Sequence, residues 1–411
     1  MLALMRSISG PFAAALCLSM SAPLLRSQDP MSPAETHVVI DLGPLGGDWD
    51  DFTPMGINDR GEIVLQRTSA QQVAHAHFVR GIEETDIGTL AGARTVGYDL
   101  NDHGLIVGRS QTADGQFHGF QWFGGAMLDL GTLGGDWSEA RGVNNRGDVV
   151  GSSTTGSGAS HAFLWHNGLL FDLFTTGETR AFSINNKGWI VGERDSSAVI
   201  WRGLSIETLE NLGGWSRAYK VDDAGAACGF AYSGGRQLPV IWTETRIHAL
   251  PTAGGGTWES VNAMSPCGLA VGVITNPGRE AAVWRGDTLY PLNAYLGASQ
   301  SACRDVNASG EILGWMERPG QGLRAFLMVP SEPAIIHAEV MSGRRLRLIS
   351  RAYPWESEKV SLETSPAQDP HKKWEDATAA KKYYGNGLFH FEVEVSEEDN
   401  VRLFRVRVSP D

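Results

Sequence analysis

Residues 128–165 read LDLGTLGGDWSEARGVNNRGDVVGSSTTGSGASHAFLW and contain every feature that recurs along this chain. At their centre, Val143 is followed by Asn144, two variable residues and Gly147. Asn at the first position of a turn bonds forward to the backbone, and Gly at the fourth position ends the turn without steric conflict. A Val-rich segment follows at 148–152, so the pattern predicts a hairpin tip between two short strands.

The same turn pattern occurs seven times, as an apolar residue, then Asn, Asp or Ser, two variable residues and Gly. Its copies are 57–61, 100–104, 143–147, 184–188, 221–225, 264–268 and 306–310. Successive glycines lie 43, 43, 41, 37, 43 and 42 residues apart. A second recurring segment, HAFLW at 161–165, has a small residue second and most often Trp fifth. A period of this length with four strands is typical of one propeller blade.

The two ends of the repeat region indicate how a ring would close. One extra strand, 37–42, precedes the first turn pattern, and none follows the seventh HAF-like segment at 324–328. An N-terminal strand that completes the last blade removes exposed edges, whereas an open solenoid needs capping units. We therefore expect an all-β fold with a seven-bladed β-propeller over residues 37–330, closed by its N-terminal strand beside 324–330.

The blocks of this repeat resemble the HAF family of extracellular repeat proteins. The resemblance is carried by LDLGTLGGDWS at 128–138, GVNNRG at 142–147, VVGS at 149–152 and HAFLW at 161–165. It spans residues 37–330, although the fourth to seventh copies lose the His of HAF. The resemblance implies an extracellular protein with a propeller-like fold, and it carries over no catalytic residue.

Residues 331–411 abandon the period. Apolar and charged residues alternate at 345–349, 388–395 and 401–408, as in strands with one buried face. The tail is therefore predicted to be a small β-sandwich. Through 362–365, Trp374 and 403–408 it resembles the fibronectin-III-like tails of exported bacterial proteins.

The beginning of the chain and its composition indicate where the protein acts. Residues 1–27 have a short positive region at Arg6 and an apolar stretch at 12–25, which predicts an export signal. We expect an extracellular or periplasmic monomer without a membrane span. With a net charge of −13, the chain has no cationic excess for binding nucleic acid.

One face of the predicted ring, called here the rim face, carries the loops that lead into the inner strand of each blade. Candidate ligand-binding residues on these loops are Trp49, Asp136, Trp137, Trp215, Arg217 and Trp258. Indole rings beside polar groups suit sugar stacking. The alternative is that these tryptophans pack between blades.

Metal and cofactor sites are not expected. His75 and His77 alternate along a strand, yet both occupy ordinary repeat positions. We expect His75, His118 and His161 to bond to backbone across a blade rather than to a metal.

Three functions remain open. The first is a non-catalytic binding or scaffold protein that recognises a glycan or another surface component, including a surface protein. The second is a glycan hydrolase, which needs two carboxylates at a set separation, or a lyase. A lyase would use Tyr98, Arg141, Tyr219 and Arg304, which recur two residues before the apolar residue of the turn pattern. The third is a purely structural envelope protein.

Overall fold

The computed structural model describes the repeat region at residues 33–46, 55–68, 73–173, 177–203 and 205–331. In the tail it describes the residues of strands β29 to β35. The predicted export signal at 1–27 lies outside the described residues, as does Trp49.

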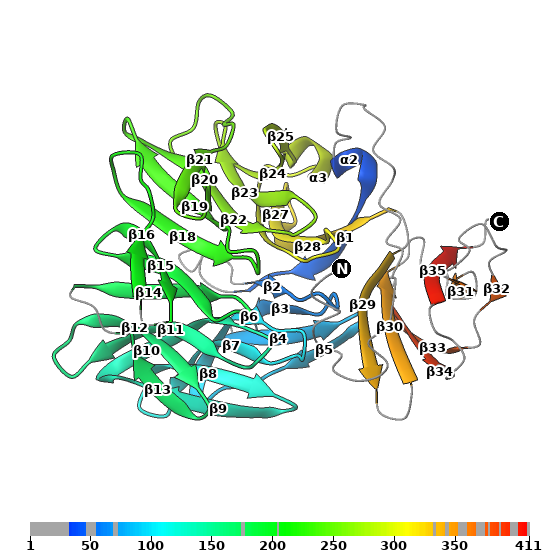
Figure 1. The fold of residues 1–411 in the computed structure, drawn as a ribbon, viewed down its shortest axis with the longest axis horizontal. Helices are drawn as coiled ribbons and strands as arrows, with labels where there is room; N and C mark the ends of the chain where they lie inside the picture. Colours follow the sequence, from blue (N-terminus) through cyan, green and yellow to red (C-terminus); the bar gives the residue numbers. More distant parts are fainter. Residues whose placement is uncertain are drawn as a thin grey trace.

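Consecutive strands of the repeat region form antiparallel units of four, arranged around a common centre as propeller blades (Figure 1). Four of these units are separate sheets. The first consists of β2 (Gly56–Ile57), β3 (Ile63–Thr68), β4 (Ala74–Arg80) and β5 (Glu83–Asp86), and the second of β14 (Thr179–Ile184), β15 (Trp189–Arg194), β16 (Ser197–Arg202) and β17 (Ser205–Thr208). The third consists of β18 (Ser216–Val221), β19 (Ala227–Ser233), β20 (Arg236–Thr243) and β21 (Arg246–Ala249), and the fourth of β22 (Ser260–Met264), β23 (Leu269–Thr275), β24 (Arg279–Arg285) and β25 (Thr288–Pro291). The fifth is β26 (Gln300–Val306), β27 (Ile312–Arg318), β28 (Gly322–Pro330) and β1 (His37–Pro44).

The remaining eight strands form one sheet. They are β6 (Ala91–Leu100), β7 (Ile106–Thr112), β8 (Phe117–Phe123), β9 (Ala126–Gly131), β10 (Gly134–Val143), β11 (Val149–Thr155), β12 (Ser160–His166) and β13 (Leu169–Asp172). β10 joins β8 because Trp137 pairs in parallel with Phe117. The prediction of seven separate blades is therefore corrected to five four-stranded blades and one eight-stranded sheet.

The N-terminal strand closes the ring as predicted. β1 pairs antiparallel with β28, from His37 opposite Pro330 to Pro44 opposite Arg324. Ile40 is buried in an apolar cluster with residues of β27 and β28. At the surface, Arg324 Nε donates to both carboxylate oxygens of Asp41, at 3.0 and 2.8 Å.

His–Asp pairs occupy the corresponding position in three other units. His75, His118 and His161 place Nδ1 at 2.8, 2.9 and 2.9 Å from the carboxylates of Asp86, Asp129 and Asp172. These carboxylate partners on the outer strand were not expected, whereas the expected backbone partner across a blade is confirmed for His75. The Nε2 atom of His75 also lies 3.0 Å from the Ala93 carbonyl oxygen.

A β-bulge near the end of the inner strands sets the geometry at the axis. In β10 the register shifts between Ala140 and Gly142, which leaves Arg141 as the extra residue. The bulge brings the Glu139 carbonyl so close to Gly151 that a Cβ there would lie 1.9 Å from the oxygen. The same shift occurs in β6, β14, β18, β22 and β26, and a bulge of this kind re-aims the extra side chain.

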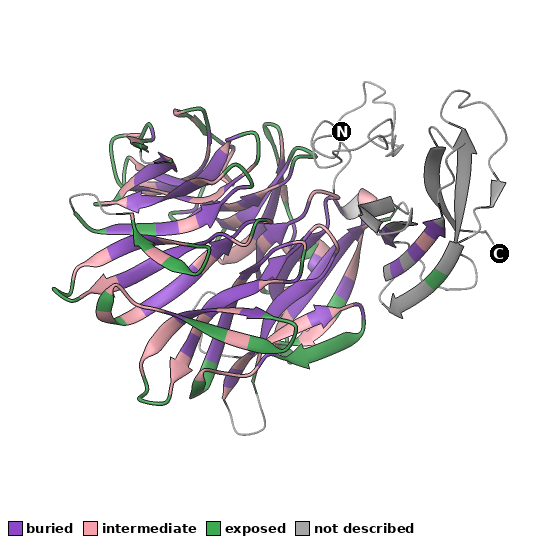
Figure 2. Cartoon of the chain, turned by 60° about the horizontal axis from the view of Figure 1, so that its bottom comes forward, coloured by how far each residue is buried: buried purple, intermediate pink, exposed green. Residues whose placement is uncertain are grey.

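Burial falls from the centre to the periphery of each unit (Figure 2). In β11 the first five residues are buried, whereas β13 has three exposed residues out of four. Two helices of four residues each, α2 (Pro33–Thr36) and α3 (Asn293–Leu296), complete the described repeat region.

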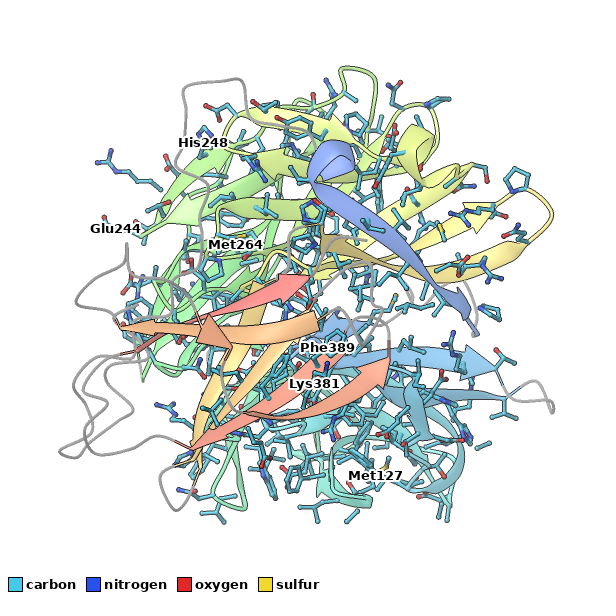
Figure 3. All side chains as sticks on the ribbon, turned by 90° about the vertical axis from the view of Figure 1, so that its right-hand side faces the viewer. Met127, Glu244, His248, Met264, Lys381 and Phe389 are labelled. Carbon is cyan, nitrogen blue, oxygen red and sulfur yellow. The ribbon has the colours of Figure 1, made fainter. Side chains whose placement is uncertain are left out.

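The tail contains two sheets. One has the order β29 (Ala334–Met341), β30 (Arg345–Arg351), β34 (Leu388–Glu394), β33 (Ala379–Gly385), and the other β32 (Glu375–Asp376), β31 (Val360–Pro366), β35 (Arg402–Val408). Phe389 and Phe391 of β34 are buried with their ring centres 6.3 Å apart, while Lys381 of β33 is exposed (Figure 3).

We expect apolar packing, rather than the surface ion pair, to hold the ring closed. Ile40→Ala should lower the free energy of unfolding by about 2–4 kcal/mol. Asp41→Asn should lower it by less than about 1 kcal/mol, because the two partners are 28% and 24% exposed. Urea denaturation measures both, and a larger loss for Asp41→Asn would contradict this account.

Candidate functional site

Two tryptophans of the rim face are exposed. Trp215 directly precedes β18 and is 36% exposed, and Trp258 lies two residues before β22 and is 52% exposed. Both stand six residues before the apolar residue of their turn pattern. Because β18 and β22 are in contact, the two tryptophans belong to neighbouring blades. Packing between blades therefore does not account for these two side chains.

The indole of Trp215 is fixed by its neighbours. It stacks on Tyr232 at a centroid distance of 5.9 Å with 19° between the rings, and meets Phe230 edge-on at 5.0 Å. The guanidinium of Arg217 lies 5.3 Å from the Trp215 ring centre and donates to both oxygens of Glu193, at 2.7 and 2.9 Å. The ring is thus held in place without a ligand.

Arg217 supports the aromatic cluster. Burial alone would lower the pKa of its guanidinium, but the hydrogen bonds and charge of Glu193 outweigh burial and raise that pKa. The guanidinium also lies 5.2 Å from the ring centre of Phe182 on β14. Since Glu193 neutralises it, Arg217 presents no net charge beside Trp215.

The other predicted rim residues lie elsewhere. Asp136 and Trp137 belong to β10, two units before β18 along the chain, and the Trp137 amide donates to Thr154 Oγ1 at 3.1 Å. Among the described residues, no hydrogen bond or ring contact joins Asp136 or Trp137 to Trp215. The structure therefore brings together Trp215 and Arg217, with Trp258 on the adjacent blade, and not the whole predicted set.

The opposite face, called here the turn face, has a pocket of about 210 Å³ on the axis. It is lined by residues from all seven turn patterns, and its polar wall includes Asp59, Asp102, Asn145, Asn186 and Asp223. Met264, labelled in Figure 3, is one of its apolar lining residues. Sequence reasoning treated these residues as turns only.

Lys220 reaches across the axis and lines this pocket together with Asp99 and Asp305. Its Nζ lies 3.1 Å from Asp99 Oδ1 and 3.5 Å from Asp305 Oδ2, on β6 and β26. Burial by itself would lower the pKa of the Lys220 ammonium group. The attraction of the two carboxylates is larger, so the pKa is raised above its ordinary value. Burial also raises the pKa of Asp305, more than Lys220 lowers it. Lys220, Asp99 and Asp305 each stand one residue before the apolar residue of their turn pattern. The other repeats have Gly, Ser or Ala at this position, so the charged residues there were the sequence signal that could have revealed this ion group.

Asp59 is a strongly perturbed carboxyl in the pocket wall. Burial, and next the nearby charge of Asp102, raise its pKa to about 7. Its Oδ1 accepts a hydrogen bond from the Ala308 amide at 2.8 Å. The pocket thus holds more negative charge than its lysine balances.

The residues proposed for a lyase occupy the bulge positions. The guanidinium of Arg141 lies 4.0 Å from the ring centre of Tyr98, and Tyr219 lies 6.0 Å from Phe182. Burial lowers the pKa of Arg304 to about 10, and Arg141 contributes to this lowering. Polar side chains therefore line this part of the axis.

Within the described ranges, no group of three or more His, Cys, Asp or Glu side chains is placed to hold a metal ion. The helices found in those ranges are too short to cross a membrane.

No family model matches this chain, and no curated protein matches it. Among solved structures it is similar to a puromycin-hydrolyzing peptidase of Mycobacterium tuberculosis, at 11% identity and TM-score 0.49, over 80% of this chain and 61% of that one. It therefore spans less than two-thirds of that peptidase. It is also similar to the BP39L lectin of Burkholderia pseudomallei (8% identity, TM-score 0.41, 67% and 95% covered) and to a lectin of Aleuria aurantia (10%, 0.34, 68% and 96%). At these identities and TM-scores the likenesses do not indicate a function.

Lys220→Met should lower the free energy of unfolding by about 2–3 kcal/mol, because Asp99 and Asp305 would lose their counter-ion. The loss is kept below that of a fully buried pair because the Lys220 side chain is 32% exposed. The double variant Lys220→Met/Asp305→Asn should recover part of it. Equal urea midpoints for wild type and Lys220→Met would contradict the assignment.

Asp59 should make stability fall as pH rises from about 4 to about 7. Its folded-state pKa of about 7 exceeds the ordinary 3.8, so the native state holds an extra proton in that window. Asp59→Asn keeps the acceptor for Ala308 and removes the charge. It should raise the thermal midpoint by a few degrees at pH 8 and leave it unchanged at pH 4, as scanning calorimetry would show.

Proposed function

We propose that this protein is an exported, non-catalytic binding or scaffold protein whose rim face recognises a glycan through Trp215 and Trp258. The observation that carries this proposal is the exposure of these two indoles at one repeat position of neighbouring blades. An exposed tryptophan offers a flat apolar surface to the C–H face of a sugar ring. Because Trp215 is already held by Tyr232 and Arg217, little side-chain freedom is lost on binding.

The charge of Arg217 does not by itself favour an acidic sugar, because Glu193 engages it through two hydrogen bonds. The half-exposed Arg180 lies 3.7 Å from the same carboxylate. The exposed indole and the polar groups around it remain for stacking and hydrogen bonding.

The ring is proposed to consist of seven HAF-type units, with β6–β9 and β10–β13 counted as two. Support comes from the seven turn patterns, all of which contribute to the axial pocket. Export is proposed from residues 1–27, and a fibronectin-III-like sandwich from the alternating strands of the tail.

A catalytic role is the second candidate. It is favoured by the polar axis, where Arg304, Tyr219 and Arg141 occupy bulge positions and Asp305 has a raised pKa. Release of reducing or unsaturated ends from a polysaccharide would identify this activity.

A glycan array run on wild type, Trp215→Ala and Trp258→Ala tests the binding role. Each substitution should weaken binding of the recognised glycan about tenfold or more, since a stacked ring contributes about 1–3 kcal/mol. Phe123→Ala is the matched control, because Phe123 is 58% exposed at the end of β8, away from the rim loops. Absence of any bound glycan would favour a purely structural role.

A further inference from the structure

Hydrogen bonds between turns tie neighbouring units together around the axis. Asn58, Asn101, Asn144 and Asn185 each donate from Nδ2 to the carbonyl of the equivalent residue in the next unit, at 2.8–3.1 Å. Ser265 Oγ and Asn307 Nδ2 continue the series at 2.7 and 3.1 Å, and the bond from Asn307 to Asn58 closes the circle. The link from Asp222 to Ser265 is missing, because a carboxylate has no proton to donate.

A second set of bonds runs from the next residue of each turn. The amides of Asp59, Asp102, Asn145 and Asn186 donate to the side-chain oxygen of the following unit, at 2.8–2.9 Å. After Asp223 the next unit has Pro266, which offers no side-chain oxygen. This set is therefore interrupted at the same joint, and also at the following one, because Pro266 has no N–H and Ala308 has no side-chain oxygen.

A third link lies between the HAF-like segment of one unit and the inner strand of the next. In four joints an amide donates to a buried hydroxyl at 2.8–3.0 Å, as from Ala198 to Ser216 Oγ. Between β20 and β22 the amide is replaced by Pro239, which has no N–H, and the hydroxyl by Glu259. Burial raises the pKa of the Glu259 carboxyl.

All three departures fall at one joint, between the blades β18–β21 and β22–β25. Bonds near the rim remain. Arg236 Nε donates to the Gly256 carbonyl at 2.9 Å and Gln237 Nε2 to the Glu259 carbonyl at 3.2 Å. The Gln237 amide also donates to the Thr257 carbonyl at 3.1 Å, where Gln237 pairs in parallel with Trp258. Apolar packing of Cys228 with Val261 and its neighbours also remains. The joint is closed, but among the joints of the described residues it alone lacks all three kinds of link.

We propose that this joint is the weak point of the ring and opens before any other. Trp215 and Trp258 lie on its two sides, so its opening changes the distance between them. The opening itself does not depend on whether a glycan binds there.

Two buried cysteines allow a direct test. Cys228 lies in the core between β18–β21 and β22–β25, and Cys303 lies in the core between β22–β25 and the closing blade. Both are fully buried, and burial raises the pKa of the Cys228 thiol to about 12, so a closed ring keeps it unreactive. The exposed Cys267 serves as the immediate-labelling reference.

Labelling of the full chain with a thiol reagent under native conditions, followed by peptide mass spectrometry, gives the opening rate at each joint. We expect Cys228 to label at least tenfold faster than Cys303. Asp222→Asn supplies the missing donor while keeping the Oδ1 acceptor used by the Gly225 and Ala226 amides. Because one added hydrogen bond makes opening of this joint less favourable by about 1 kcal/mol, the variant should slow the labelling of Cys228 about fivefold. The labelling of Cys303 should stay unchanged.

The matched variant is Asn185→Asp, which removes the same donor from the intact preceding joint. It should leave the ratio of Cys228 to Cys303 labelling above tenfold. Equal labelling of the two cysteines in wild type, or unchanged labelling of Cys228 in Asp222→Asn, would overturn the proposal.

Discussion

The hydrogen bond from a turn side chain to the turn carbonyl of the next unit is the constraint on which this ring depends. Each hairpin tip leaves a carbonyl facing the axis, and a buried carbonyl without a donor is costly. Asn58 resolves this with one side chain, because its Oδ1 accepts the amides of its own turn while its Nδ2 satisfies the neighbour. Asp can perform the first role only, so the identity of this residue determines both the turn and the contact between units.

Because the turn face carries this repeated bonding, variation among the units is tolerated on the rim face. There the residue six places before the turn's apolar residue is half-buried at Trp137 and exposed at Trp215 and Trp258. Pairing with the preceding unit does not explain the difference, because Trp137 and Trp258 both pair in parallel with it, at Phe117 and Gln237, and Trp258 is still exposed. Trp215 instead stacks on Tyr232 of its own blade and keeps part of its surface accessible.

Much of the fold could be predicted from the sequence because its information is local and repeated. Asn-to-Gly spacing specifies the hairpins, and the unmatched strand at 37–42 specifies the closure. The merged sheet could not be predicted, because it depends on one parallel pairing between Trp137 and Phe117. The ion group of Lys220, Asp99 and Asp305 was missed for a related reason. These residues are 121 and 85 positions apart along the chain, and only the ring brings them within 3.5 Å.

That ion group bears on the joint at which the turn bonds are interrupted. Lys220 stands on the inner strand directly before the joint, and Asp305 stands on the inner strand two units later, beyond it. Their contact therefore crosses the axis and joins the blade β18–β21 to the closing blade, which flank β22–β25 on its two sides. A charge pair of this reach is insensitive to the exact spacing of adjacent turns, unlike a hydrogen bond. The pair therefore adds no direct ion pair across the joint between β18–β21 and β22–β25, and that joint is left with the rim bonds and apolar packing alone.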